Sequence, residues 1–168
     1  MIQIRKHERK DIPFHVKWFN NFKVNKYLGD KLGEKTSLKK EKKWFSNYEL
    51  AKNKKFFTIC DKSKPIGLVG ISNINPINKT ADLFIAIGED NYHGKGIGKD
   101  TMLWIIDYGF NTLKLHKLKL AVIKNNIPAV RLYHSLGFIL EGEIKKENYY
   151  QGRYYSLLLM AIFNKSKK

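Results

Sequence analysis

Apolar and polar residues recur along the chain with the two periods that distinguish strands from helices. They alternate at the start, from Met1 to Arg5, which predicts a short strand. Further apolar or alternating runs bounded by turn residues predict six more strands, at residues 55–60, 66–74, 80–87, 118–122, 138–145 and 154–163. We therefore expect a central sheet of six to seven strands.

Helical spacing of apolar residues predicts four helices between these strands. Asp11 and Ser37 are the residue types that cap the first two. A helix at 126–136 ends at Gly137. Another follows a glycine-rich loop at 90–98, and its inward residues are Met102, Ile105, Ile106, Gly109 and Phe110.

Mixed strands and helices predict an α/β or α+β fold, with a mixed, mostly antiparallel sheet flanked by helices. A chain of 168 residues suits one hydrophobic core. No repeat, low-complexity tract or linker divides it. We expect one domain over residues 1–163 and a loose basic tail at 164–168.

The net charge of +17 comes from 32 Lys and Arg against 15 Asp and Glu. It either attracts anionic partners or reflects a Lys-rich genome that fills exposed positions with lysine. The lysines are scattered along the chain, which favours the second interpretation for most of them.

Cysteine and hydropathy limit the class of protein further. The single cysteine, Cys60, lies in an apolar stretch and is expected to be a packed thiol. No His, Cys or Asp cluster has metal-ligand spacing, so we expect no metal. The absence of a signal-type segment or an apolar run of membrane-spanning length leads us to expect a cytoplasmic protein.

The most informative segment runs from Ile85 to Asp100, where an apolar strand enters a glycine-rich loop and a helix follows. Glycines at 94, 96 and 98 leave backbone N–H groups unobstructed beside the positive end of a helix dipole. This pattern is typical of a site for linked phosphates. A dinucleotide-binding unit would need an acid about 20 residues downstream, where this chain has none.

Two motifs resemble the GNAT superfamily of N-acetyltransferases. Residues His93 to Gly98 (His-Gly-Lys-Gly-Ile-Gly) match the family's acyl-CoA loop, Arg/Gln-x-x-Gly-x-Gly/Ala, except at the first position. Residues 126–138 match its Asn-x-x-Ala-x-x-x-Tyr-x-x-x-Gly-Phe segment. Residues 113–118 and Glu141–Gly142 are similar to the branch of spermidine and ribosomal-protein N-terminal acetyltransferases.

The resemblance implies that acetyl-CoA is the acyl donor. It also implies that the strand before the loop splays from its neighbour, so that its free backbone groups pair with the pantetheine arm. The cofactor-binding residues expected on this basis are Ile85, Ala86, Ile87, His93, Gly94, Lys95, Gly96, Ile97, Gly98, Lys99, Asn126 and Ala129.

The resemblance makes Tyr133 the expected general acid, since a phenol with an ordinary pKa near 10 stays protonated at neutral pH. Tyr133 could instead be a core residue. Asn126 could be a helix cap as well as a cofactor contact. Asp82 is a candidate base, or a solvated strand carboxylate.

Glu34 and Glu41 lie where the family builds its acceptor pocket, and surface positions would explain them equally well. A nucleotide-linked aminosugar or a protein N-terminus suits the positive charge better than a polyamine does. The alternatives are a non-catalytic acyl-CoA-binding module or a basic nucleic-acid-binding domain, although no RRM, KH or helix-turn-helix signature is present. Dimers are common in the family, and the sequence leaves the oligomeric state open.

Overall fold

The computed structural model describes residues 1–28 and 32–165. This part of the chain forms one seven-stranded sheet in the order β1-β2-β3-β4-β5-β7-β6. Its neighbouring strands are antiparallel except for the parallel pair β4 and β5. The predicted fold class is confirmed. The strands are β1 (Ile2–Lys6), β2 (Lys55–Asp61), β3 (Lys64–Asn75), β4 (Thr80–Ile87), β5 (Lys117–Ile123), β6 (Ile139–Tyr150) and β7 (Arg153–Phe163).

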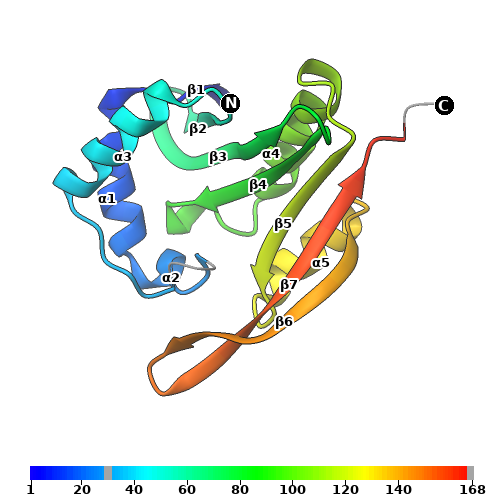
Figure 1. Cartoon of the computed structure of the whole chain (residues 1–168). Helices are drawn as coiled ribbons and strands as arrows, with labels where there is room; N and C mark the ends of the chain where they lie inside the picture. Colours follow the sequence, from blue (N-terminus) through cyan, green and yellow to red (C-terminus); the bar gives the residue numbers. More distant parts are fainter. Residues whose placement is uncertain (29–31, 166–168) are drawn as a thin grey trace.

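Helices cover the two faces of the sheet unequally. Helices α1, α2 and α3 lie beside the β1–β4 half, whereas α4 and α5 lie behind the sheet (Figure 1). The β6–β7 hairpin extends from the far edge towards α2 (Figure 1). The helices are α1 (Ile12–Asn20), α2 (Phe22–Asn25), α3 (Leu38–Leu50), α4 (Ile97–Asp107) and α5 (Ile127–Ser135).

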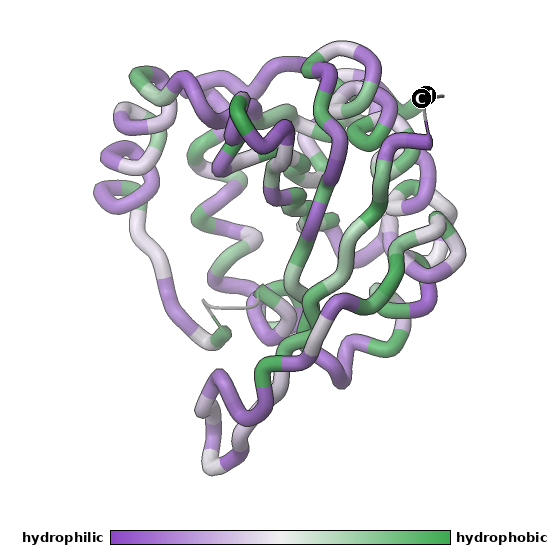
Figure 2. The backbone as a smooth tube through the Cα atoms, turned by 45° about the vertical axis from the view of Figure 1, so that its right-hand side comes forward, coloured by the Kyte–Doolittle hydropathy of each residue, from purple (hydrophilic) through white to green (hydrophobic). Residues whose placement is uncertain are grey.

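Two apolar clusters hold these layers together. The larger includes Met102 and Ile105 of α4, both fully buried, packed with strand residues such as Ile71. The smaller joins Trp18 of α1 and Phe45 of α3 to the opposite face of the sheet. Figure 2 shows hydrophobic residues along the central strands and mostly hydrophilic residues at the tip of the β6–β7 hairpin. The burial of these large side chains supplies most of the folding free energy.

The helix after the glycine loop differs from its prediction at one end. Its inward residues Met102 and Ile105 are confirmed, but the α-helix ends at Asp107 and continues as a π-helical turn, Tyr108–Thr112. There Gly109 packs so closely on β5 that an added Cβ would lie 2.8 Å from a Leu118 methyl group. The wider turn thus brings the backbone against the sheet.

The two predicted caps have different outcomes. Ser37 caps α3, because its hydroxyl accepts from the backbone N–H of Lys40 at 3.3 Å. Asp11 precedes α1, but its carboxylate does not cap the helix. It accepts hydrogen bonds from Arg5 at 2.6 and 2.7 Å and from the Thr58 hydroxyl at 2.8 Å. The Glu8 backbone N–H also donates to the Asp11 carboxylate, at 3.0 Å, so Asp11 closes the turn before α1 instead of capping the helix itself.

The remaining predictions concern the packing of Cys60, a metal site, a membrane-spanning segment and the C-terminal tail. Cys60 is free and 2% exposed, so the packed thiol is confirmed. The described residues include no cluster of three metal-ligating side chains and no helix with the length and apolarity of a membrane span. Of the predicted tail, residues 166–168 lie outside the described part, and the Asn164 backbone N–H donates to the His116 carbonyl.

Candidate active site

A slot opens in the middle of the sheet. Strands β4 and β5 pair through three residues each, 80–82 with 117–119, although they continue to Ile87 and Ile123. They diverge from there, as Figure 1 shows. The edge of β4 from Leu83 to Ile87 therefore faces a gap where the next strand of a sheet would pair. This splayed pair is what the family resemblance implies.

Asp82, the candidate base, lies where the slot closes. Strand β3 has one residue more than β4 at this point, which makes a bulge between Ser72 and Asn75. Within the bulge Asn73 has φ +50°, and its side-chain amide donates to Asp82 at 2.7 Å. The other carboxylate oxygen of Asp82 lies 3.4 Å from Lys119 Nζ. Both oxygens of Asp82 are therefore engaged.

The predicted phosphate loop lies at the open end of the slot, between β4 and α4. Gly94 and Gly96 have φ of +73° and +81°, in the left-handed region that favours glycine. A Cβ added at either would meet no protein atom within 4 Å, so the space above both is open. The first amides of α4 have no partner within the helix and carry its positive end. This loop, residues 93–98, fits an anion such as a diphosphate, and we call it the cradle.

The side chains of the cradle have different surroundings. Lys95 and Lys99 are exposed and can add positive charge, whereas the side chain of Ile97 is buried in the larger core. The His93 ring Nε2 lies 2.9 Å from the carbonyl oxygen of Ile87. His93 therefore links the cradle to the last residue of β4, a contact that the motif alone did not indicate.

Helix α5 starts directly after β5, on the other side of the slot. The Asn126 side chain accepts from the Ala129 backbone N–H at 3.4 Å, so it caps the helix. Tyr133, on the same helix, is 8% exposed and packs against Phe138, with 5.7 Å between ring centroids. Burial raises the pKa of Tyr133 to about 12. Its hydroxyl is therefore protonated at neutral pH.

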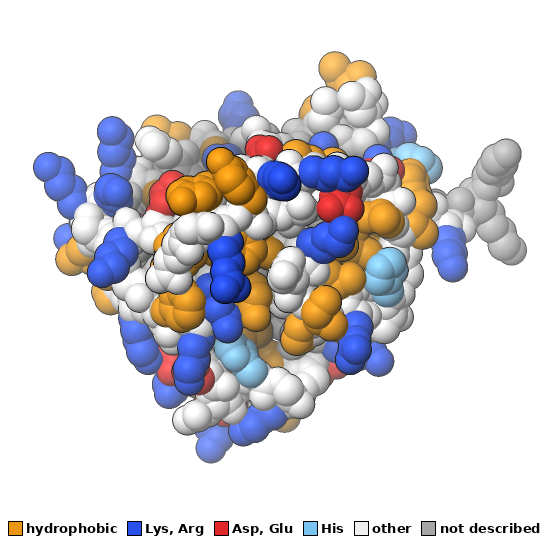
Figure 3. Space-filling view, turned by 90° about the horizontal axis from the view of Figure 1, so that it is seen from below, with side chains coloured by type: hydrophobic (Ala, Val, Ile, Leu, Met, Phe, Trp, Pro, Cys, Tyr) orange, Lys and Arg blue, Asp and Glu red, His pale blue; other side chains and the backbone are white. Residues whose placement is uncertain are grey.

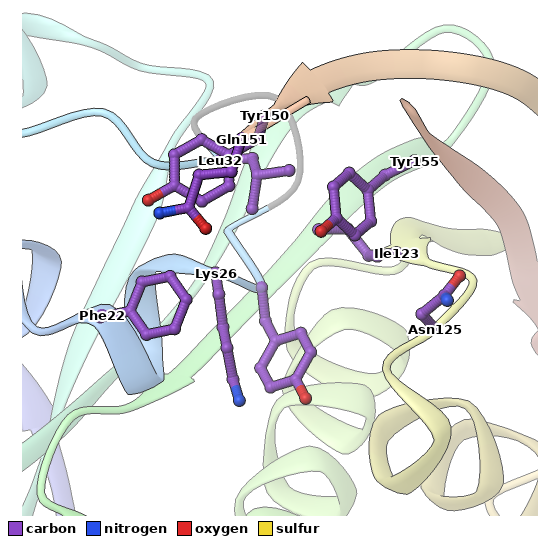
Figure 4. A pocket seen from close by; sticks show the side chains of 9 residues that line it. Phe22, Lys26, Leu32, Ile123, Asn125, Tyr150, Gln151 and Tyr155 are labelled. Atoms are coloured by element: carbon purple, nitrogen blue, oxygen red, sulfur yellow. The ribbon is translucent and has the colours of Figure 1, made fainter. Parts of the chain in front are cut away.

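A pocket of about 190 Å³ also lies at the open end of the slot. It is formed by α2 and the residues around it, the end of β5, and the turn of the β6–β7 hairpin (Figure 4). These segments are far apart in sequence, so periodicity could not group them. The lining residues are Phe22, Lys26, Tyr27, Leu32, Ile123, Asn125, Tyr150, Gln151 and Tyr155.

Neither predicted acceptor carboxylate lines this pocket. Glu34 is exposed in the connection before α3. Glu41 is 8% exposed, accepts from the Thr36 hydroxyl at 2.6 Å and lies 3.2 Å from His15 Nδ1. Glu41 therefore contacts α1 in the interior, and the structure does not bring the two acids together at an open site.

Helix α1 is joined to the segment between β4 and the cradle. The indole N–H of Trp18 donates to Glu89 at 2.9 Å, and Lys17 also contacts Glu89, at 2.5 Å. Next to them, the side-chain amide of Asn21 donates to Asp90 at 3.3 Å. We call this set the α1 latch. It fixes the helices beside the pocket to the loop that leads into the cradle.

The chain matches the family model described as an acetyltransferase (GNAT) domain over residues 2–139. It therefore belongs to the GNAT family of acetyltransferases. It is an acetyl-CoA-dependent N-acetyltransferase, as the two motifs predicted.

Similar proteins include spermidine acetyltransferases. Spermidine N(1)-acetyltransferase of Escherichia coli strain K12 is 32% identical over 162 residues, which cover 96% of this chain and 86% of that protein. The crystal structure of spermidine N-acetyltransferase from Vibrio cholerae in complex with CoA and spermine has a TM-score of 0.88 at 31% identity, covering 96% and 95% of the two chains. Acetyltransferase PseH of Campylobacter jejuni is 26% identical over 136 residues, 81% of this chain and 82% of that protein. The predicted branch is confirmed.

Proposed function

We propose that the chain transfers the acetyl group to the primary amine of a small molecule within the slot between β4 and β5. One observation carries this proposal: the slot has the cradle on one side of its open end and the aromatic pocket on the other. A donor held by the cradle and an acceptor held by the pocket would meet between the two strands.

The cradle and the edge of β4 would hold the donor. Backbone N–H groups from Gly94 to Lys99 suit the linked phosphates of CoA, and Lys95 and Lys99 add charge. The unpaired backbone groups at Ile85–Ile87 suit the amides of an extended arm. Acetyl-CoA supplies a thioester, whose C–S bond breaks as the C–N bond of the amide forms.

Two side chains of the chain would move protons. Tyr133 would donate its phenolic proton to the departing sulfur, since its raised pKa keeps that proton in place until it is needed. Asp82 would accept a proton from the incoming ammonium, directly or through water. Its hydrogen bond from Asn73 would hold the carboxylate in position.

The acceptor that we prefer for this chain differs from the one in the names of its relatives. Those relatives are named for spermidine, a polycation that carboxylates without another cationic partner would bind most strongly. In this chain Asp82 pairs with Lys119, and the net charge is +17. A nucleotide-linked aminosugar or a protein N-terminus is therefore our preferred acceptor, and a polyamine is the alternative.

The experiment is a panel of amines assayed for free-thiol release from acetyl-CoA. The panel contains spermidine, spermine, a nucleotide-linked aminosugar and short peptides with free N-termini, with a blank that lacks amine. Release above the blank, with the acetylated amine identified by mass spectrometry, would support the proposal. No thiol release above the blank with any amine, together with normal acetyl-CoA binding, would instead favour a non-catalytic acyl-CoA-binding module.

A further inference from the structure

The pocket at the open end of the slot is basic and aromatic. Four of its nine lining residues carry aromatic rings, from Phe22, Tyr27, Tyr150 and Tyr155. Among the described lining residues, Lys26 is the one charged side chain, and no carboxylate is present. Such a lining suits a planar group and a negative charge.

Lys26 lies beside the rings and has no acidic partner among the described residues. Its Nζ lies 4.8 Å from the Tyr27 ring centroid and 5.9 Å from that of Phe22. Figure 4 shows its side chain extending beside the Phe22 ring. The neighbouring Lys17 and Lys23 form ion pairs with Glu89 and Asp90, whereas Lys26 forms none with the described residues. Its charge is therefore available to a ligand.

Two acids near the slot, Asp82 and Asp90, are already ion-paired. Asp82 lies 3.4 Å from Lys119, and Asp90 lies 2.9 Å from Lys23. A polycation would have to displace these lysines, and each displaced pair would offset the attraction that it gains. An anion meets no such competition at Lys26.

We infer that this pocket binds a phosphate or carboxylate group carried by the same small molecule as the acceptor amine. The inference rests on the proposed function and names the class of its acceptor, an amine that is also an anion. A volume of about 190 Å³ takes one such group and part of a ring. The amine at the other end of that molecule would extend towards the slot.

The first experiment compares matched amines on the wild-type chain. Glucosamine 6-phosphate is set against glucosamine, and 4-aminobutyrate against butylamine, with spermidine as the cationic reference. The expected result is a higher kcat/KM for the member that carries the phosphate or carboxylate in at least one pair, by about 10- to 100-fold. The pair that shows the preference distinguishes phosphate from carboxylate. A preference for the members without an anionic group, or for spermidine, would overturn the inference.

The second experiment changes the charge. Lys26→Gln should lower kcat/KM for the member with the phosphate or carboxylate by more than for the member without it, which removes the preference, and Lys26→Glu should favour spermidine. Lys43→Gln, on the exposed side of α3, is the control and should behave as wild type. An equal loss for both members of a pair in Lys26→Gln would show a merely structural role and overturn the inference.

A binding measurement separates this inference from the proposed function. Glucosamine 6-phosphate and, separately, 4-aminobutyrate are titrated calorimetrically into the wild type and Lys26→Gln, with CoA present to fill the cradle. Weaker binding of either ligand to Lys26→Gln supports the inference even if no amine is acetylated, in which case only the proposed function fails. If each ligand binds equally to the two proteins, or neither ligand binds, the inference is overturned even if other amines are acetylated.

Discussion

Tyr133 combines burial on α5 with a hydroxyl that stays protonated at neutral pH. Removing that hydroxyl leaves the ring and its packing against Phe138 in place. Tyr133→Phe should therefore test proton donation with little change in fold.

We expect Tyr133→Phe to lower kcat by about 10²- to 10⁴-fold, the usual contribution of a general acid. The dissociation constant for CoA, measured by calorimetry, should remain within about twofold of wild type. Tyr149→Phe, on an exposed ring of β6, is the matched control. Unchanged turnover in Tyr133→Phe would assign the proton to another donor.

A second group of residues concerns stability. The rings of His7 and His15 are buried and stack with centroids 4.6 Å apart and an interplanar angle of 8°. His7 Nδ1 lies 2.9 Å from the Thr58 hydroxyl. Burial, followed by the repulsion of a charged His15, lowers the pKa of His7 to about 4.

This low pKa predicts a loss of stability in acid. The unfolded chain binds a proton at His7 near pH 6.5, and the folded chain binds it near pH 4. The contribution is complete above pH 6.5 and falls progressively as the pH drops towards 4, by about 3 kcal/mol in total. Urea denaturation between pH 4 and 7 measures it. His7→Gln should flatten this dependence, and the exposed His134→Gln should not; equal slopes in all three would refute the prediction.

The glycines of the cradle can be tested by adding one methyl group. Gly96→Ala places a Cβ in the open space above the loop and strains a left-handed residue, so acetyl-CoA should bind about tenfold more weakly. Gly152→Ala, in the β6–β7 turn, introduces similar strain at φ +78° without touching the cradle. Calorimetric titration with CoA distinguishes them. Equal affinity in both variants would exclude this loop as the phosphate site.

At the residue scale, the sequence indicated the side chains that act on neighbouring positions. It did not indicate partners that are distant along the chain. Cap residues such as Ser37, and the cradle glycines, act within a few positions of themselves, so the sequence indicated them. Asp11 has the residue type of a cap, but its partner Thr58 is 47 positions away. Glu41 was predicted to hold the acceptor, and its contact with His15 depends on how α1 and α3 pack.

At the scale of elements, α1 packs closely against the residue that follows β4. A Cβ added to Gly88 would lie 2.1 Å from the Trp18 indole, which is 1% exposed. The α1 latch therefore depends on the absence of a side chain at position 88.

Gly88→Ala should push α1 away from β4 and lower the free energy of unfolding by about 1–3 kcal/mol, as overpacking does. Gly142→Ala is the control, because its Cβ would meet nothing within 4 Å. Chemical denaturation followed by Trp fluorescence measures both. If the stabilities of the two variants agree, the latch is looser than the structure indicates.

Element types were predictable from periodicity, but their irregularities were not. The strands at 80–87 and 154–163 followed from their apolar residues, and the structure places them within one residue of those bounds. The π turn at 108–112 packs Gly109 closely against β5, and in the bulge between β3 and β4 Asn73 donates to Asp82. Neither leaves a mark in the spacing of apolar residues.

The whole molecule carries a strong positive field. Figure 3 shows Lys and Arg side chains spread over the face seen from below, with few acidic ones among them. Acetyl-CoA is an anion, so this field should assist its binding beyond the contacts of the cradle.

We expect KM for acetyl-CoA to rise several-fold between about 0.02 and 0.5 M salt, because the Debye length shortens over this range. KM for an amine acceptor without an anionic group, which is a cation at neutral pH, should not rise over this range and serves as the internal control. Steady-state kinetics at five salt concentrations measures both. A salt-independent KM for acetyl-CoA would confine binding to short-range contacts.

At this scale, the fold class and the donor site were predictable because each rests on contiguous motifs. The aromatic pocket was not, since Phe22, Ile123 and Tyr150 meet only after the sheet has formed. Lys26, the lysine of this pocket, could not be distinguished in the sequence from the other lysines of the chain.

Across the gap between β4 and β5, the acyl donor and the acceptor amine would be bound by different kinds of atoms. In the proposed arrangement, main-chain groups line the donor side, and nearly every amino acid supplies these alike. Side chains from α2 and the hairpin would line the acceptor side, so that each exchange there would alter the preference for the amine. Such a scaffold can change the amine that it modifies by a few substitutions at the rim, while its acyl source stays the same.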